Sequence, residues 1–130
     1  MTLDHVTITA LDLRVSAAFY DAALAALGLG RLVELVDEEE QSPDTEAIGW
    51  GRDGRAVLWV VAGERPTTGV HLRLRAADQG AVRAFHAAAV AAGGSSHDAP
   101  RRWAIYRAGE FNAIVRDPDG NLIEAVAPEQ

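Results

Sequence analysis

The sequence predicts an α+β fold built from two tandem β-α-β-β-β modules. Short segments in which apolar and polar residues alternate predict strands, and two alanine-rich segments with apolar residues at helical spacing predict helices. The strongest observation is an internal repeat, because residues 5–28 align without a gap on residues 71–94 with ten identities, six of them alanine pairs. The other four identities are His5/His71, Asp12/Asp78, Phe19/Phe85 and Gly28/Gly94.

The chain length of 130 residues is that of one domain. We therefore expect a single domain over 1–130, with a first module over about 1–65 and a second over about 66–130. The same offset also aligns Asp53-Gly54 with Asp119-Gly120, which predicts equivalent turns before the last strand of each module.

In the first module, the alternation over 3–10 predicts a strand. Asp12 is placed to cap the following helix through its carboxylate, and Gly28 is placed to end it. The expected apolar face of that helix comprises Val15, Ala18, Phe19, Ala22, Ala23 and Ala26. Three further strands are predicted, over 32–36, 47–51 and 56–62.

The second module repeats this order. A strand over 70–76 precedes a helix that Asp78 caps, with an expected apolar face of Ala81, Ala84, Phe85, Ala88, Ala89 and Ala92. A weak strand is predicted near His97. Strands over 112–116 and 121–126 flank the turn Asp117-Pro118-Asp119-Gly120.

The composition excludes several classes of protein. A net charge of −7 without a basic run gives no electrostatic basis for nucleic-acid binding. The absence of cysteine removes disulfides, thiolate catalysis and cysteine-ligated zinc. No apolar stretch is long enough to span a membrane and no signal peptide precedes the first strand, so we expect a cytoplasmic protein. The acidic stretch 37–46 is either a solvated loop or a flap over a site.

Three side chains are candidate metal ligands. His5 and His71 occupy equivalent positions of the repeat, so pseudo-two-fold symmetry would bring them together, and a neutral imidazole is a metal ligand. Glu124 lies in an otherwise apolar strand, where a carboxylate must be protonated, paired or bound to a metal. The alternatives are hydrogen-bonded strand histidines and a salt bridge from Glu124 to an arginine such as Arg73. Two histidines and one carboxylate leave coordination positions open for substrate.

The chain resembles the vicinal oxygen chelate superfamily, which contains glyoxalase I, bleomycin-resistance proteins and extradiol dioxygenases. The resemblance rests on Leu3-Asp-His-Val, Ala18-Phe-Tyr, Gly69-Val-His-Leu and Asp117-Pro-Asp-Gly-Asn-Leu-Ile-Glu-Ala-Val. It implies a cup-shaped, partly open mixed β-barrel, a homodimer and a divalent ion (Fe, Mn, Zn, Ni or Co) on His5, His71 and Glu124. Glyoxalase I enzymes bring four ligands, and the repeat places Leu58 where a second glutamate would stand, so a three-ligand site is expected.

The resemblance also implies a small-molecule substrate whose vicinal oxygens the metal chelates, in lyase, isomerase or dioxygenase chemistry. Glu124 and Tyr106 are the candidate catalytic residues. Arg73, Tyr106 and Arg107 are the candidate substrate-binding residues, since an arginine binds a carboxylate or phosphate through two hydrogen bonds. The alternative function is that of a non-catalytic small-molecule or antibiotic-binding protein.

The remaining aromatic and histidine residues are weaker candidates. His86 is expected on a helix surface, and neither His86 nor His97 is an obvious catalytic base. Trp50, Trp59 and Trp103 would line a pocket or simply pack. Strand alternation combined with the repeat predicts that Leu58 and Val60 face the cup, which would put Trp59 against a helix.

Overall fold

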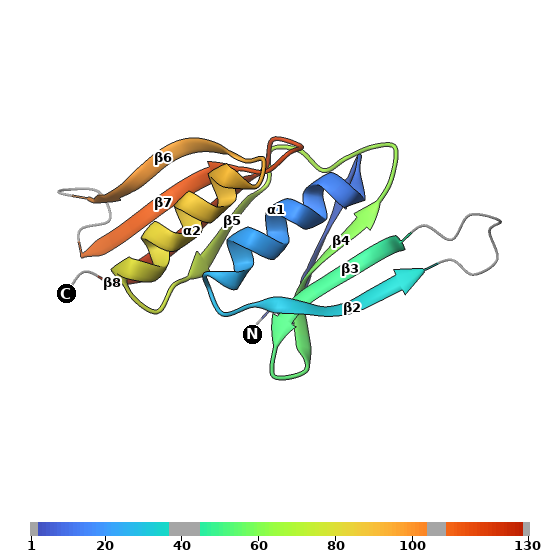
Figure 1. Ribbon diagram of the computed structural model, residues 1–130, viewed down its shortest axis with the longest axis horizontal. Coiled ribbons are helices and arrows are strands. Elements are labelled where there is room, and N and C mark those ends of the chain that lie inside the picture. Colours follow the sequence, from blue (N-terminus) through green and yellow to red (C-terminus); the bar gives the residue numbers. More distant parts are fainter. Residues whose placement is uncertain (1–2, 37–44, 104–108, 129–130) are drawn as a thin grey trace.

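The computed structural model describes residues 3–36, 45–103 and 109–128 (Figure 1). It confirms the α+β fold with two successive β-α-β-β-β units. The first unit comprises β1 (Val6–Ala10), α1 (Leu13–Ala25), β2 (Gly30–Val36), β3 (Thr45–Arg52) and β4 (Arg55–Ala62). The second comprises β5 (His71–Arg75), α2 (Gln79–Ala91), β6 (Ser95–Arg102), β7 (Glu110–Arg116) and β8 (Leu122–Pro128).

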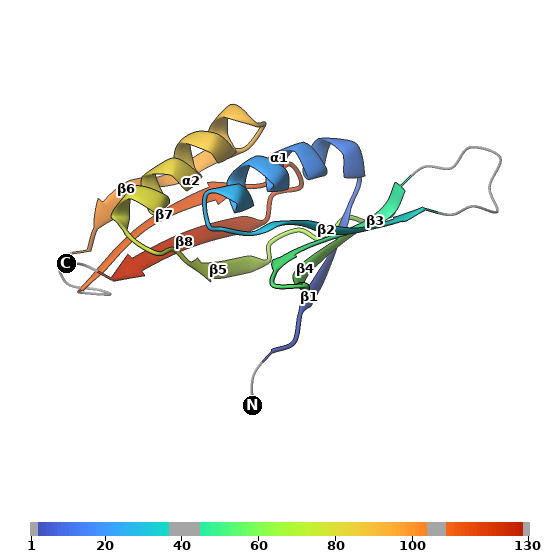
Figure 2. The same cartoon turned by 60° about the horizontal axis from the view of Figure 1, so that its bottom comes forward.

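Each unit forms its own four-stranded mixed sheet, in the orders β1-β4-β3-β2 and β5-β8-β7-β6. In both sheets the first strand of the unit runs parallel to the last, and the other neighbours are antiparallel. Over the described residues the two sheets are not closed into one barrel. Figures 1 and 2 show α1 and α2 lying next to each other on the same side of both sheets.

Both helices begin as the sequence predicts. The carboxylate of Asp12 accepts a hydrogen bond from the backbone N–H of Val15, and that of Asp78 accepts one from Ala81. Gly28 follows α1 with a φ of +78°, the left-handed conformation that ends many helices. Neither helix is long and apolar enough to cross a membrane, and the other described residues contain no such helix.

The predicted apolar face of α1 is partly wrong. Val15 is 47% exposed and Ala18 is also exposed. The helix instead buries a face rotated from the predicted one, made of Leu13, Ser16, Ala17, Phe19, Tyr20, Ala23 and Leu24. The reason is that α1 packs on its own sheet and on α2 together, so two contact directions decide which residues are buried. On α2 the buried residues are Val82, Phe85 and Ala89, so the prediction missed Val82 and wrongly included Ala84, which is exposed.

Both modules contribute to a single hydrophobic core. Phe19 and Tyr20 from α1 and Phe85 from α2 are fully buried in it, together with Trp50 from β3. The two modules approach closely where the ring of Phe19 reaches Gly94, since a Cβ on that glycine would lie 2.5 Å from a carbon of the ring. Packing of this kind fixes the relative position of the two sheets.

The prediction that Leu58 and Val60 face away from the helices is wrong. Both side chains lie in the core, and Trp59 points to the opposite face of β4. The cause is a shift of one residue in how the modules correspond. Val6 pairs with Leu58, whereas its repeat equivalent Leu72 pairs with Ile123, so β4 matches β8 at an offset of 65 residues and not 66. Thr7 consequently pairs with Trp59, whereas the equivalent Arg73 pairs with Glu124.

Candidate functional site

The candidate site lies on the face of the second sheet that points away from α2, which we call its helix-distal face. On β8, Ile123 and Ala125 enter the core, so Glu124 between them points to the helix-distal face. Neighbouring side chains nevertheless cover Glu124 completely, leaving it 0% exposed. An ionised carboxylate in such a place requires hydrogen bonds or charge partners.

His71 is the first partner of Glu124. It begins β5, the strand parallel to β8, and its Nε2 donates a hydrogen bond of 2.8 Å to Oε1 of Glu124. Two ligands that each lie about 2.1 Å from one ion, at right angles, are about 3.0 Å apart. The His71 nitrogen and the Glu124 oxygen thus already stand nearly as far apart as two adjacent metal ligands.

Arg73 is the second partner and binds the other carboxylate oxygen. Its Nε donates to Oε2 of Glu124 at 3.2 Å, and its Nη2 donates to Glu110 at 2.5 Å. The hydrogen bond to Glu110 is the main cause that raises the pKa of Arg73, with Glu124 adding to it. The salt bridge considered from the sequence is therefore present, and it leaves Oε1 on the side of His71.

Asn112 and Trp103 complete the environment of Glu124, and sequence reasoning missed both roles. The side-chain amide of Asn112, which is fully buried on β7, donates to Oε2 of Glu124 at 2.7 Å. The indole N–H of Trp103 donates to the amide oxygen of Asn112, which fixes the orientation of that amide. A polar residue within the apolar run from Phe111 to Val115 was the available signal, of the same kind that identified Glu124.

His5 lies elsewhere in the chain. It precedes β1 in the first module, is exposed, and bonds Asp4 through Nδ1 at 2.7 Å. This bond is the main cause that lowers the pKa of Asp4. Within the described ranges, no three histidine, aspartate or glutamate side chains gather closely enough to hold a metal ion. The fold of one chain thus brings together His71 and Glu124 but not His5.

A buried network connects the two modules and supports the start of β5. The hydroxyl of Tyr20 on α1 donates to Asp117 at 2.6 Å, and burial followed by the nearby charge of Asp117 raises the pKa of Tyr20. Asp117 also accepts from the backbone and side chain of Asn121. Asn121 in turn accepts from the N–H of Val70 and donates to the carbonyl of Thr67. Val70, the residue that precedes His71, is therefore held by Asn121, whose position depends in turn on Asp117 and Tyr20.

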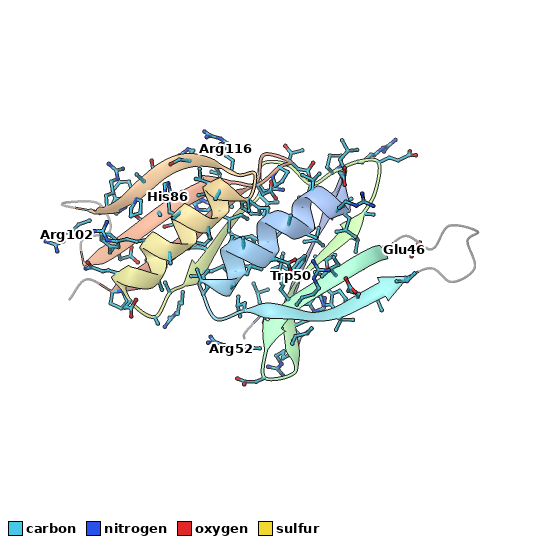
Figure 3. The ribbon with its side chains drawn as sticks, viewed as in Figure 1. Glu46, Trp50, Arg52, His86, Arg102 and Arg116 are labelled. Atoms are coloured by element: carbon cyan, nitrogen blue, oxygen red, sulfur yellow. The ribbon has the colours of Figure 1, made fainter. Side chains whose placement is uncertain are left out.

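The other residues selected from the sequence fall into three groups. Tyr106 and Arg107 lie outside the described residues. His86 on α2 is partly buried and bonds Ser96 on β6 at 2.8 Å, so it is less solvated than expected (Figure 3). Trp50 packs in the core and donates to Asp21 at 2.9 Å, the plain packing role considered for the tryptophans.

Comparison with known proteins now adds to this geometry. The sequence profile of the Glyoxalase/Bleomycin resistance protein/Dioxygenase superfamily matches residues 2–125. The chain belongs to this superfamily. The match covers both modules and so includes His5, His71 and Glu124.

Solved structures agree with this assignment. A glyoxalase/bleomycin resistance protein from Albidiferax ferrireducens is 28% identical, with a TM-score of 0.75 over 95% of this chain and 97% of that one. A family enzyme from Burkholderia phytofirmans shares the fold at 20% identity and a TM-score of 0.66, over 98% and 99% of the two chains. A glyoxalase I variant from Zea mays shares it at 16% identity and 0.69, over 98% of this chain and 45% of that one. Among curated proteins, no match was found.

Proposed function

We propose that this member of the superfamily is a divalent-metal-dependent enzyme that acts on a small molecule with vicinal oxygens. The observation that carries the proposal is the pair His71–Glu124, whose 2.8 Å separation suits two adjacent ligands of one ion. A divalent ion held there would act as a Lewis acid toward adjacent substrate oxygens.

The surroundings of Glu124 support a ligand role for one of its oxygens. Arg73 and Asn112 both donate to Oε2, so the carboxylate is held in one orientation with Oε1 directed to His71. Such supporting hydrogen bonds are typical of residues that ligate metals. Arg73 already offsets the negative charge of Glu124, which weakens the attraction of that carboxylate for a cation. The site would therefore need ligands from a second segment to hold a divalent ion tightly.

We assign that second segment to a second copy of the chain. His5 is exposed on the first module, away from Glu124, and the two sheets of one chain do not close around a common site. In a homodimer, His5 of one copy would complete the set of His71 and Glu124 of the other. Arg73, Tyr106 and Arg107 are then the proposed substrate-binding residues, and Tyr106 the proposed proton donor.

Calorimetric titration of chelator-treated protein tests the ligand assignment. Mn²⁺, Co²⁺, Ni²⁺, Zn²⁺ and anaerobic Fe²⁺ are added in turn to the wild type and to His71→Gln and Glu124→Gln. We expect one ion per chain for at least one of these metals, and an affinity loss of about 100-fold or more in both variants. Glu110→Gln is the matched control, because it removes a carboxylate from the same arginine and should change the affinity less than about threefold.

A spectroscopic titration tests the substrate class. Catechol, which carries two vicinal oxygens, should alter the visible absorption of the Co²⁺-loaded protein by entering the open coordination positions. Failure of every metal to bind the wild type would reject the metal-dependent function. Metal binding with no response to catechol would retain the ion but reject vicinal-oxygen chelation.

A further inference from the structure

We propose that a second site, in a crevice between the two modules, binds an oxyanion that is attached to an apolar group. The crevice lies where the β3–β4 hairpin meets β5 and the segment after α1, and its volume is about 600 Å³. This volume is within the usual range of small-molecule sites. We call it the arginine crevice, after the residues that give it its charge: Arg52, Arg55 and Arg75.

The charge of the arginine crevice is opposite to that of the whole protein. Three arginines and one carboxylate, Asp53, line it, whereas the chain carries a net charge of −7. None of the three arginines forms an ion pair within 4.0 Å with another described residue, in contrast to Arg31 and Arg73, although the charge of Arg55 helps to lower the pKa of Asp4. Guanidinium groups without a carboxylate partner are donors available to a planar or tetrahedral oxyanion.

The larger cavity beside α1 shows that this charge pattern is not general. That cavity, of about 920 Å³, is lined by more carboxylates than arginines, and its Arg31 is bound by both Asp21 and Glu34. Its second arginine, Arg14, is exposed. Of these two cavities, the arginine crevice is the one with an excess of positive charge.

Arg55 and Arg75 are the two arginines that we expect to bind the oxyanion. Arg52 has a structural role as well, because its Nη1 lies beside Gly28, at the negative C-terminal end of α1. Figure 3 shows the Arg52 side chain extending outward beside the hairpin. Arg55 is exposed in the same hairpin and Arg75 is exposed at the end of β5, so an anion between them would join the two modules.

The remaining wall of the arginine crevice is apolar. Leu27 and Leu29 come from the segment after α1, Val57 from β4 and Leu74 from β5. Apolar surface beside a cluster of cations suits a ligand with an anionic end and an apolar body. The two candidate classes of ligand, phosphate esters and carboxylates, both carry an oxyanion.

This site is separate from the one around Glu124. Arg75 follows His71 by four residues on an extended strand, which is about 13 Å. Arg73 is nearer, about 7 Å away along the strand, but neither it nor His71 nor Glu124 lines the crevice. Binding there should therefore persist without metal, and the inference holds or fails independently of the metal-dependent function.

Calorimetric titrations of metal-free protein, from which the chelator has been removed, test the inference with phenyl phosphate and benzoate as the two oxyanion probes and benzyl alcohol as the neutral one. We expect the wild type to bind at least one oxyanion and not the alcohol, with weaker binding at higher salt. Arg55→Gln and Arg75→Gln should each weaken binding about tenfold or more, and Arg75→Lys less. The stronger of the two oxyanions identifies the ligand as a phosphate ester or a carboxylate.

The matched control is Arg14→Gln, which removes an exposed arginine from the other cavity and should change the affinity less than about twofold. Thermal unfolding of each variant confirms that it is folded, and Arg75→Lys keeps the charge should Arg75→Gln fail to fold. The inference is overturned if neither oxyanion binds more tightly than benzyl alcohol. It is also overturned if Arg14→Gln weakens binding as much as Arg55→Gln and Arg75→Gln do.

Discussion

On the sheet faces that point away from the helices, the two modules carry different chemistry at corresponding positions of the backbone. The first module pairs Thr7 on β1 with Trp59 on β4, whereas the second pairs Arg73 on β5 with Glu124 on β8. Toward the helices the modules remain alike, with Phe19 and Phe85 each fully buried. Core packing thus preserves the repeated fold, while the opposite face has diverged into a polar site in one module.

Gly28 and Gly94, which the repeat aligns, also have different structural roles in the two modules. Gly28 has a positive φ and ends α1. Gly94 does not, and is required instead because Phe19 of the other module leaves no room for a Cβ. After α2 it is Gly93 that takes the positive φ, so the identity between Gly28 and Gly94 joins two different physical roles.

The largest expected effect on stability is in the shared core. It tests the claim that the two modules pack alike on the sheet faces that point to the helices. Phe19→Ala and Phe85→Ala should each lower the free energy of unfolding by about 3–5 kcal/mol, because each leaves a cavity in the shared core. Urea unfolding measures both. A cost below about 1 kcal/mol in either variant would show that the two helices are not equivalent parts of one core.

A smaller effect is expected in the polar site, where the modules differ. Glu124→Gln should lower the free energy of unfolding by about 1–3 kcal/mol, because the neutral amide leaves the donors of Arg73 and Asn112 partly unsatisfied. Glu110→Gln removes the half-exposed partner of the same arginine and should cost less than about 1 kcal/mol. Equal costs would mean that burial of Glu124 adds nothing to its interactions.

The network that joins the modules should contribute a comparable or slightly smaller amount. Tyr20→Phe removes the buried hydroxyl that donates to Asp117, and we expect a loss of about 1–2 kcal/mol in urea unfolding. Hydrogen exchange at the Val70 amide should also accelerate, since Asn121 holds that amide and is itself bonded to Asp117. Unchanged exchange at Val70 would show that the network does not support β5.

The smallest effect is expected for the two helix caps, which occupy equivalent positions in the two modules. Asp12→Ala and Asp78→Ala each remove a helix cap, and each should lower the free energy of unfolding by about 1 kcal/mol. The two losses should agree within about 0.5 kcal/mol and add in the double variant, because the caps are independent. Strong non-additivity would contradict two separately capped helices.

The sequence was sufficient for the elements and for part of the site. Alternation, helical spacing and the two aspartate caps located nearly every strand and helix, and one carboxylate in an apolar strand identified Glu124. Arg73 was correctly placed on the same strand face as His71. These features are local or depend on a repeat, so they can be read along the chain.

The remaining features depend on tertiary structure. Strand β4 matches β8 at an offset of 65 residues, one fewer than the repeat, which reverses the predicted faces of Leu58 and Trp59, and a gapless repeat cannot reveal such a shift. The separation of His5 from Glu124 depends on how the two modules pack, which strand patterns do not encode. The arginine crevice combines segments from both modules and has no motif of its own.

The central claim is that His71 and Glu124 form part of a metal site that His5 of a second copy completes. Differently tagged His5→Ala and His71→Ala chains are coexpressed, the heterodimer is isolated, and its metal content is compared with that of each variant alone. The account predicts one intact site per heterodimer and almost none in either homodimer, since one pairing joins an intact His5 to an intact His71. A heterodimer with no more metal than the homodimers, or the absence of any dimer, would contradict it.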